Sequence, residues 1–127
     1  MNEGKSGRDV SIGVSPVSHR VVTEATTLTG NDEHVKVTIP LASASDYDVT
    51  LPPLSERPGQ KIFISCVRAN GSYSDGGVQV VDQSDGITVP AAVGLTNDKL
   101  TTPANGDHVY VENVMGLFWH EISELTT

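Results

Sequence analysis

The chain has 127 residues and a net charge of −8, from 16 acidic and 8 basic side chains. This length suits one domain of ordinary size, and the acidic charge repels nucleic acid and anionic membranes, so we expect neither as a partner. The single cysteine excludes an internal disulfide, and no apolar run approaches the roughly 20 residues that a membrane-spanning helix needs.

The first 25 residues differ from the rest of the chain. They hold three basic and three acidic side chains, so the whole charge of −8 belongs to residues 26–127. Apolar residues occupy every second position over 10–14, which predicts a strand with one apolar face, and Pro16 restricts that strand to an edge or an arm. A second extended piece is expected over 19–23. The sequence therefore predicts an extended N-terminal arm over 1–25 and a single β domain over 26–127.

Within the β domain, alternating apolar and polar residues predict strands with one buried face. The alternation is clearest over 35–39 and 47–51. The most apolar stretch, 60–67, is expected to be a central strand. We interpret Cys66 within it as a small buried side chain, because no activating neighbour is visible in the sequence. Further strands are expected at 78–81, at 87–89, near Leu100, at 108–114 and at 117–123.

Roughly eight short strands separated by turns, without helical periodicity, indicate an all-β fold. A β-sandwich and a small Greek-key or jelly-roll-like barrel are both compatible with this pattern. Aromatic residues are sparse and absent before Tyr47, so we expect other copies of the chain to supply additional burial. Met115-Gly116 is the predicted turn between the last two strands, which would place His120 opposite Val111.

The sequence contains no motif for catalysis or for a cofactor, such as a phosphate loop, a dinucleotide fingerprint or a nucleophile elbow. We therefore expect a non-enzymatic protein with no cofactor and no metal site. Loop aspartates such as Asp82 and Asp85 are interpreted as turn residues, with calcium binding as the alternative. Trp119 is interpreted as a core or subunit-interface side chain, with a sugar-stacking platform as the alternative. The histidines, which we do not expect to share a metal ion, are His19, His34, His108 and His120.

The order of several short motifs gives a further indication. They read VTLPP at 49–53, PGQKIFI at 58–64, GVQV at 77–80, GDHVYV at 106–111 and MGLFWHEI at 115–122. In this order, residues 26–124 resemble the β-rich modules of tailed-bacteriophage virion proteins, namely capsid decoration (cement) proteins and the head domains of head or tail fibres. The resemblance implies a trimer without enzymatic activity and transfers no catalytic residue. Because the chain lacks the long shaft of a fibre subunit, we favour a decoration protein.

The expected function is therefore to bind the capsid shell as a homotrimer and stabilise it without chemistry. The expected partners are the major capsid protein and other copies of this chain. The start of the sequence lacks the apolar segment of a signal peptide, so we expect synthesis in the host cytoplasm and final location on the outer capsid surface of the virion. The alternative is a fibre-tip module that recognises host surface glycan through Trp119, Tyr73 and loop carboxylates.

The N-terminal arm is the predicted docking device. A strand with an apolar face and no partner within its own segment is suited to pair with the sheet edge of another chain. Basic side chains near the start of the arm would meet an acidic patch on the capsid protein or on a neighbouring subunit. The residues predicted to dock are Lys5, Arg8, Val10, Ile12 and Val14.

Overall fold

The computed structural model describes residues 19–39, 47–67, 77–83, 92–93 and 98–126. The five predicted docking residues of the arm lie outside these ranges, as do Tyr73, Asp85 and the strand expected over 87–89.

The described part of the chain is built from strands. Their bounds are β2 (His19–Val22), β3 (Thr26–Thr27), β4 (His34–Thr38), β5 (Tyr47–Thr50), β6 (Lys61–Val67), β7 (Val78–Val81), β8 (Ala92–Val93), β9 (Asp98–Leu100), β10 (His108–Val114) and β11 (Phe118–Leu125). The helical content of these residues is one short 3-10 turn at Pro103–Asn105, and none of their segments forms a helix that could cross a membrane. The all-β prediction is confirmed, and β4, β5, β6, β7 and β10 coincide closely with predicted strands.

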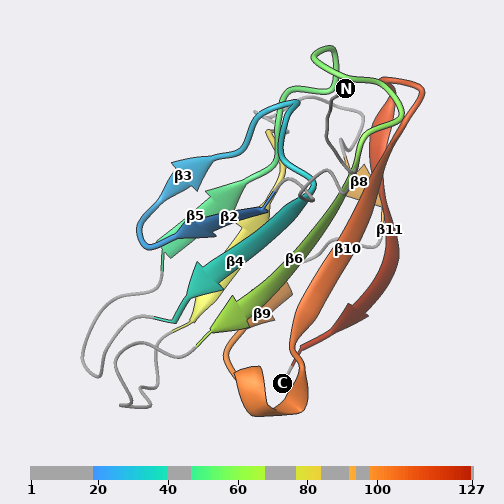
Figure 1. Ribbon diagram of the computed structural model, residues 1–127. Coiled ribbons are helices and arrows are strands. Elements are labelled where there is room, and N and C mark those ends of the chain that lie inside the picture. The colour runs from blue at the N-terminus through green and yellow to red at the C-terminus, as the bar shows by residue number, and fades with distance from the viewer. Residues whose placement is uncertain (1–18, 40–46, 68–76, 84–91, 94–97, 127) are drawn as a thin grey trace, which may run out of the picture.

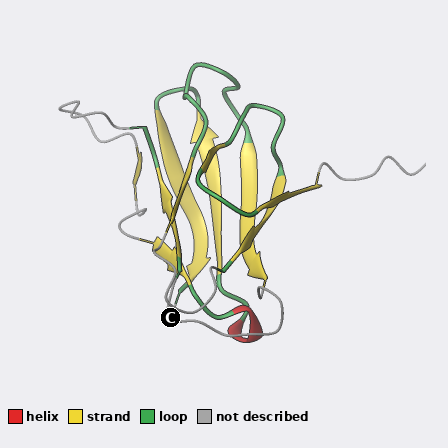
Figure 2. Cartoon of the chain, turned by 90° about the vertical axis from the view of Figure 1, so that its left-hand side faces the viewer, coloured by secondary structure: helices red, strands yellow, loops and turns green. Residues whose placement is uncertain are grey.

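The strands form two sheets, ordered β2-β4-β6-β10-β11-β8 and β3-β5-β7-β9, which appear as two layers in Figures 1 and 2. From β2 to β7 the chain changes sheet at every connection, so neighbouring strands are two apart in sequence and run parallel. Antiparallel pairs join β7 to β9, β6 to β10 and β10 to β11. Greek-key and jelly-roll motifs consist of antiparallel strands, and this parallel winding differs from them.

One core lies between the two layers, and it is mainly aliphatic. Val35, Ile62 and Val109 enter it from the larger sheet, and Val49 and Val80 enter it from the smaller one, all at most 1% exposed. β-branched side chains fit a pleated, half-buried surface well, which explains why strands rich in valine and isoleucine form these layers. Trp119 is the sole aromatic residue among the fully buried side chains that the structure describes.

The structure places the start of the β domain earlier than the predicted boundary at residue 26. Strand β2 pairs in parallel with β4 along its whole length. Its last residue, Val22, is buried in the core, and Arg20 Nη1 donates a hydrogen bond of 2.9 Å to Asp32 Oδ2. Residues 19–22 therefore belong to the larger sheet and not to a separate arm, because burial of Val22 and the Arg20–Asp32 ion pair fix them there.

The β10–β11 hairpin corrects the predicted register. Met115 and Gly116 both have positive φ, 56° and 75°, as the favoured hairpin turns require, and Leu117 N donates to Val114 O. The turn is thus where the sequence placed it. However, His120 pairs with Glu112 and not with Val111, because Val114 pairs with Phe118 and leaves Leu117 as one extra residue in the connection.

Candidate functional site

A row of rings crosses the outer face of the larger sheet, the face that points away from the core. His19, His34, Phe63 and Tyr110 are successive partners across β2, β4, β6 and β10. Neighbouring strands lie about 4.8 Å apart, so the row extends about 14 Å across the sheet. His108 on β10 packs against the same Phe63 ring. We call these five side chains the ring row.

The members of the ring row contact one another mainly by their edges. Ring centroids are 5.5 Å apart for His19 and His34, 5.4 Å for His34 and Phe63, and 5.7 Å for Phe63 and Tyr110, with interplanar angles of 84°, 85° and 67°. His108 instead stacks on Phe63 at 5.2 Å and 22°. Such contacts are favourable for aromatic pairs, and they hold Phe63 between His34 and His108.

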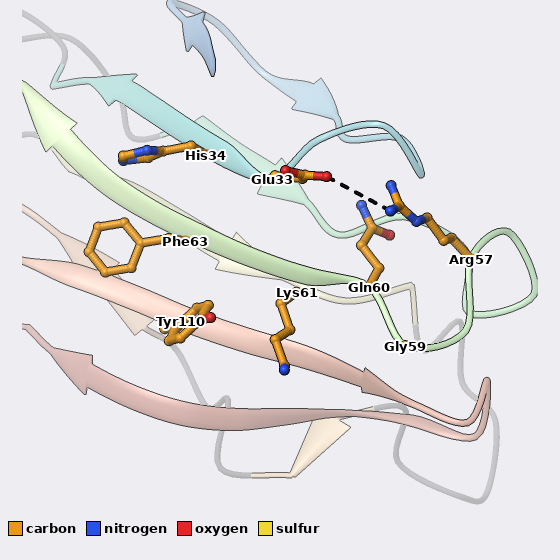
Figure 3. A pocket seen from close by; sticks show the side chains of 8 residues that line it. All are labelled: Glu33, His34, Arg57, Gly59, Gln60, Lys61, Phe63 and Tyr110. Atoms are coloured by element: carbon orange, nitrogen blue, oxygen red, sulfur yellow. Dashed lines mark ion pairs between the residues drawn. The ribbon is translucent and has the colours of Figure 1, made fainter. Parts of the chain in front are cut away.

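A groove of about 540 Å³ opens on this face, within the range of ligand-binding clefts. Figure 3 shows Phe63 and Tyr110 on one side of it and the side chains of Arg57, Gln60 and Lys61 on the other. The groove thus combines an aromatic wall with a polar, charged wall. Its lining is completed by Glu33, His34 and Gly59.

Buried hydrogen bonds fix the polar wall. The Gln60 side chain is only 3% exposed, and its Nε2 donates to the carbonyl oxygens of Thr29 at 2.9 Å and Asp32 at 2.7 Å. Asp32 Oδ2 in turn accepts a hydrogen bond of 2.8 Å from Thr29 N. These bonds tie the turn at 29–32 to the start of β6, and Glu33 follows that turn directly at the groove.

Two cationic side chains stand at the rim. Arg57 Nη1 donates to Gly30 O at 2.8 Å, whereas its Nη2 lies 3.8 Å from Glu33 Oε2, and about half of each side chain is exposed. Lys61 is exposed and lies opposite Glu112 in the strand register, but its ammonium group forms neither an ion pair nor a hydrogen bond with any described residue. Arg57 and Lys61 therefore present donors to any molecule in the groove.

His34 remains neutral in this setting. Burial lowers the pKa of His34, and the charges of Lys36 and His19 lower it further. Its Nε2 is buried, with no hydrogen-bond partner among the described residues. At neutral pH the ring is therefore an uncharged member of the ring row, next to the groove.

The structure excludes the sugar-stacking role considered for Trp119. The side chain is 1% exposed, and Trp119 Nε1 donates a hydrogen bond of 3.2 Å to Pro52 O in the interior. An indole that stacks on a sugar must offer an open face. Trp119 fills the core because it pairs with the inward-facing Asn113 on β10, so its interpretation as a core side chain is the one that holds.

Cys66 and the other predicted site residues that the structure describes form no chemical centre within the described ranges. Cys66 is buried, as the sequence indicated, and burial together with Asp107 raises the pKa of its thiol to about 11. The thiol is therefore protonated at neutral pH and weakly nucleophilic. Within the described ranges, no three His, Cys, Asp or Glu side chains lie close enough to hold a metal ion.

Comparison with known proteins gives no identification. No family model, no curated protein and no solved structure matches this chain. The features of the molecule that bear on its role are the groove, the ring row and the other exposed side chains of the larger sheet.

The groove residues were not predicted as a site. Among the aromatic residues only Trp119 and Tyr73 were considered for binding, and the histidines were not expected to share a metal ion. A signal was present in the strand alternation: His34 follows the phase of Lys36, and Tyr110 follows that of Glu112, which opposes the buried phase of each strand. Rings at such outward positions are exposed or half-buried, and their accumulation on one face indicates a contact surface.

Proposed function

We propose that this chain is a non-enzymatic capsid decoration protein that binds the phage shell as a homotrimer and stabilises it. The observation that supports the proposal is the placement of its exposed apolar side chains. Within the described residues, all of the large ones belong to the larger sheet or to its hairpin turn: Val21, Met115, Leu117, Ile122 and Leu125.

Two of these exposed side chains adjoin the ring row: Val21 and Leu125 lie at the two ends of the next row across the sheet, in which His108 pairs with Leu125. Exposed large apolar side chains confined to one sheet and its turn favour a protein interface there. Three copies of one weak contact, held together in a trimer, would bind a shell far more tightly than a single copy.

We also propose that the two sheets form a sandwich, with the ring-row face as its docking side. The shared core between layers supports this architecture. The fibre-tip alternative would need a sugar-stacking residue other than Trp119, and it is the less supported function because that indole is buried.

The first test combines mass and shell binding. Light scattering at micromolar concentration should give three times the monomer mass of 13.4 kDa. Sedimentation with undecorated shells of the same phage's major capsid protein should show saturable co-sedimentation and a higher shell melting temperature. A folded monomer, or a protein that stays in the supernatant while known decoration proteins of other shells sediment with theirs, would contradict the proposal.

A matched pair of variants tests the role of the docking side. Val21→Asp adds one charge to an exposed position of the larger sheet, and Thr27→Asp adds the same charge to an exposed position of the smaller sheet. Val21→Asp should reduce shell binding by about tenfold or more, because a charge in an apolar contact must be desolvated. Thr27→Asp should bind like the natural chain. Equal binding by both variants would remove the larger sheet from the interface.

The arm requires a separate deletion. Because β2 begins at His19, removal of residues 2–18 leaves the described sheet intact while removing all five predicted docking residues. If the arm docks, the truncated protein should fold normally but lose shell binding or trimer stability by more than about tenfold. Ile12→Asp, compared with Ser11→Asp on the opposite face of the strand predicted over 10–14, separates the apolar contact from arm length. A truncated protein that trimerises and decorates shells normally would assign the arm no docking role.

A further inference from the structure

We propose that the groove on the larger sheet binds an extended acidic segment of a partner protein. In this arrangement a carboxylate of the segment lies between Arg57 and Lys61, and an apolar or aromatic side chain of the same segment packs on Phe63 and Tyr110. The inference rests on the proposed function only in identifying that partner as the shell, and its test does not require the shell.

The charge distribution supports an acidic occupant. Among the residues that line the groove, Arg57 and Lys61 are basic and Glu33 is acidic. The groove lining therefore carries one more positive than negative side chain, on a molecule whose net charge is −8. On an acidic protein, a groove with positive charge attracts an acidic partner, while the rest of the surface repels it.

Hydrogen bonds within the protein preorganise part of the groove before a ligand binds. The buried Gln60 fixes the turn at 29–32, and the hydrogen bond from Arg57 Nη1 to Gly30 O holds one side of the guanidinium. Its Nη2 stays at a loose 3.8 Å from Glu33, so a carboxylate that replaces this contact gains a charge-assisted hydrogen bond. The turn at 29–32 and the bound side of the Arg57 guanidinium therefore have little freedom left to lose on binding, which favours affinity.

The ring geometry favours a peptide over a glycan. A sugar stacks on an open aromatic face, but Phe63 is covered by His108 on one face and contacts the edges of His34 and Tyr110. An apolar side chain needs only the van der Waals surface that ring edges offer. A row about 14 Å long also matches four or five residues of extended chain.

The experiment uses the full chain as bait for a random twelve-residue peptide library. Selected peptides should be enriched in Asp or Glu next to an apolar or aromatic residue. The affinity of the best peptide, measured by titration calorimetry, should fall about tenfold or more in Lys61→Gln and in Arg57→Gln, and should weaken as salt is raised. Tyr110→Thr, which keeps a strand-forming residue, should weaken the same peptide by a similar factor.

Thr27→Glu is the matched control, because it makes the net charge more negative by the same amount as Lys61→Gln but on the smaller sheet. It should leave peptide affinity unchanged. Absence of acidic enrichment, or equal affinity of Lys61→Gln and the natural chain, overturns the inference. So does selective binding on an anionic glycan array without peptide enrichment. Failure of the natural chain to select acidic peptides, together with normal shell decoration, would contradict this inference alone and leave the proposed function standing.

Discussion

Replacing Trp119 by alanine should destabilise the fold by about 3–5 kcal/mol, the usual cost of removing a large buried aromatic side chain. Trp119 is the bulkiest fully buried side chain in the described structure, at 1% exposure. The substitution removes its core contacts and leaves a cavity. It also deprives the Pro52 carbonyl of the 3.2 Å hydrogen bond from the indole, which adds the cost of an unsatisfied buried acceptor.

Urea unfolding followed by far-ultraviolet circular dichroism measures this loss, since the variant contains no other tryptophan to serve as a fluorescent probe. Trp119→Phe should recover more than half of the stability, because it restores most of the buried volume but not the N–H donor. Phe118→Ala on the outer face of the same strand is the control, with an expected loss well below that of Trp119→Ala. A Trp119→Ala loss under about 1 kcal/mol would show that the indole is not a core residue.

The longer strands could be predicted from the sequence, whereas the two-residue strands β3 and β8 and the assignment of strands to sheets could not. The alternation over 35–39 and 47–51 identifies the buried positions of β4 and β5 correctly. The two-residue alternation of a strand shows which side chains share a face, but it does not show which strands are neighbours. The chain changes sheet after every strand from β2 to β7, and this winding depends on packing between segments that are distant in sequence.

The same limit explains the candidate site. His34, Phe63 and Tyr110 are separated by 29 and 47 positions in the sequence and become neighbours only through the pairing of β4 with β6 and of β6 with β10. The register of each pair decides which rings meet. A shift of one residue, such as the one that separates the predicted partner of His120 from the observed one, would turn a ring from one face to the other.

Asn113 illustrates a residue whose role sequence pattern could not reveal. It continues the inward phase of Val109 and Val111 on β10 and is 0% exposed. A buried amide must satisfy its hydrogen-bonding groups locally. Its Nδ2 donates to Leu54 O at 2.9 Å and to Arg57 O at 3.1 Å, and its Oδ1 accepts 2.9 Å from Gly116 N. One side chain thus joins the hairpin turn to the loop that bears Arg57.

Asn113→Ala should therefore cost about 2–4 kcal/mol, because the Leu54 carbonyl and the Gly116 N–H lose their partner in the side chain and Arg57 O keeps only the bond from Gln60 N. Asn113→Asp retains the acceptor for Gly116 N but places a carboxylate against two carbonyl oxygens, so it should be destabilised at least as much at neutral pH. Glu112→Ala, one position away on the outer face, should change the free energy of unfolding by no more than about 0.5 kcal/mol.

Hydrogen exchange at single amides can show whether Asn113→Ala loosens the contact between the hairpin turn and the Arg57 loop or lowers the stability of the whole fold. Amide hydrogen exchange should accelerate more at Gly116, whose N–H loses its acceptor, than at Ile64 in the centre of the larger sheet. Because Arg57 is held through its carbonyl by Asn113, affinity for the groove peptide should also fall, even under conditions in which the variant is fully folded. Uniform acceleration of exchange with unchanged peptide affinity would show that Asn113 fills the core without organising the groove.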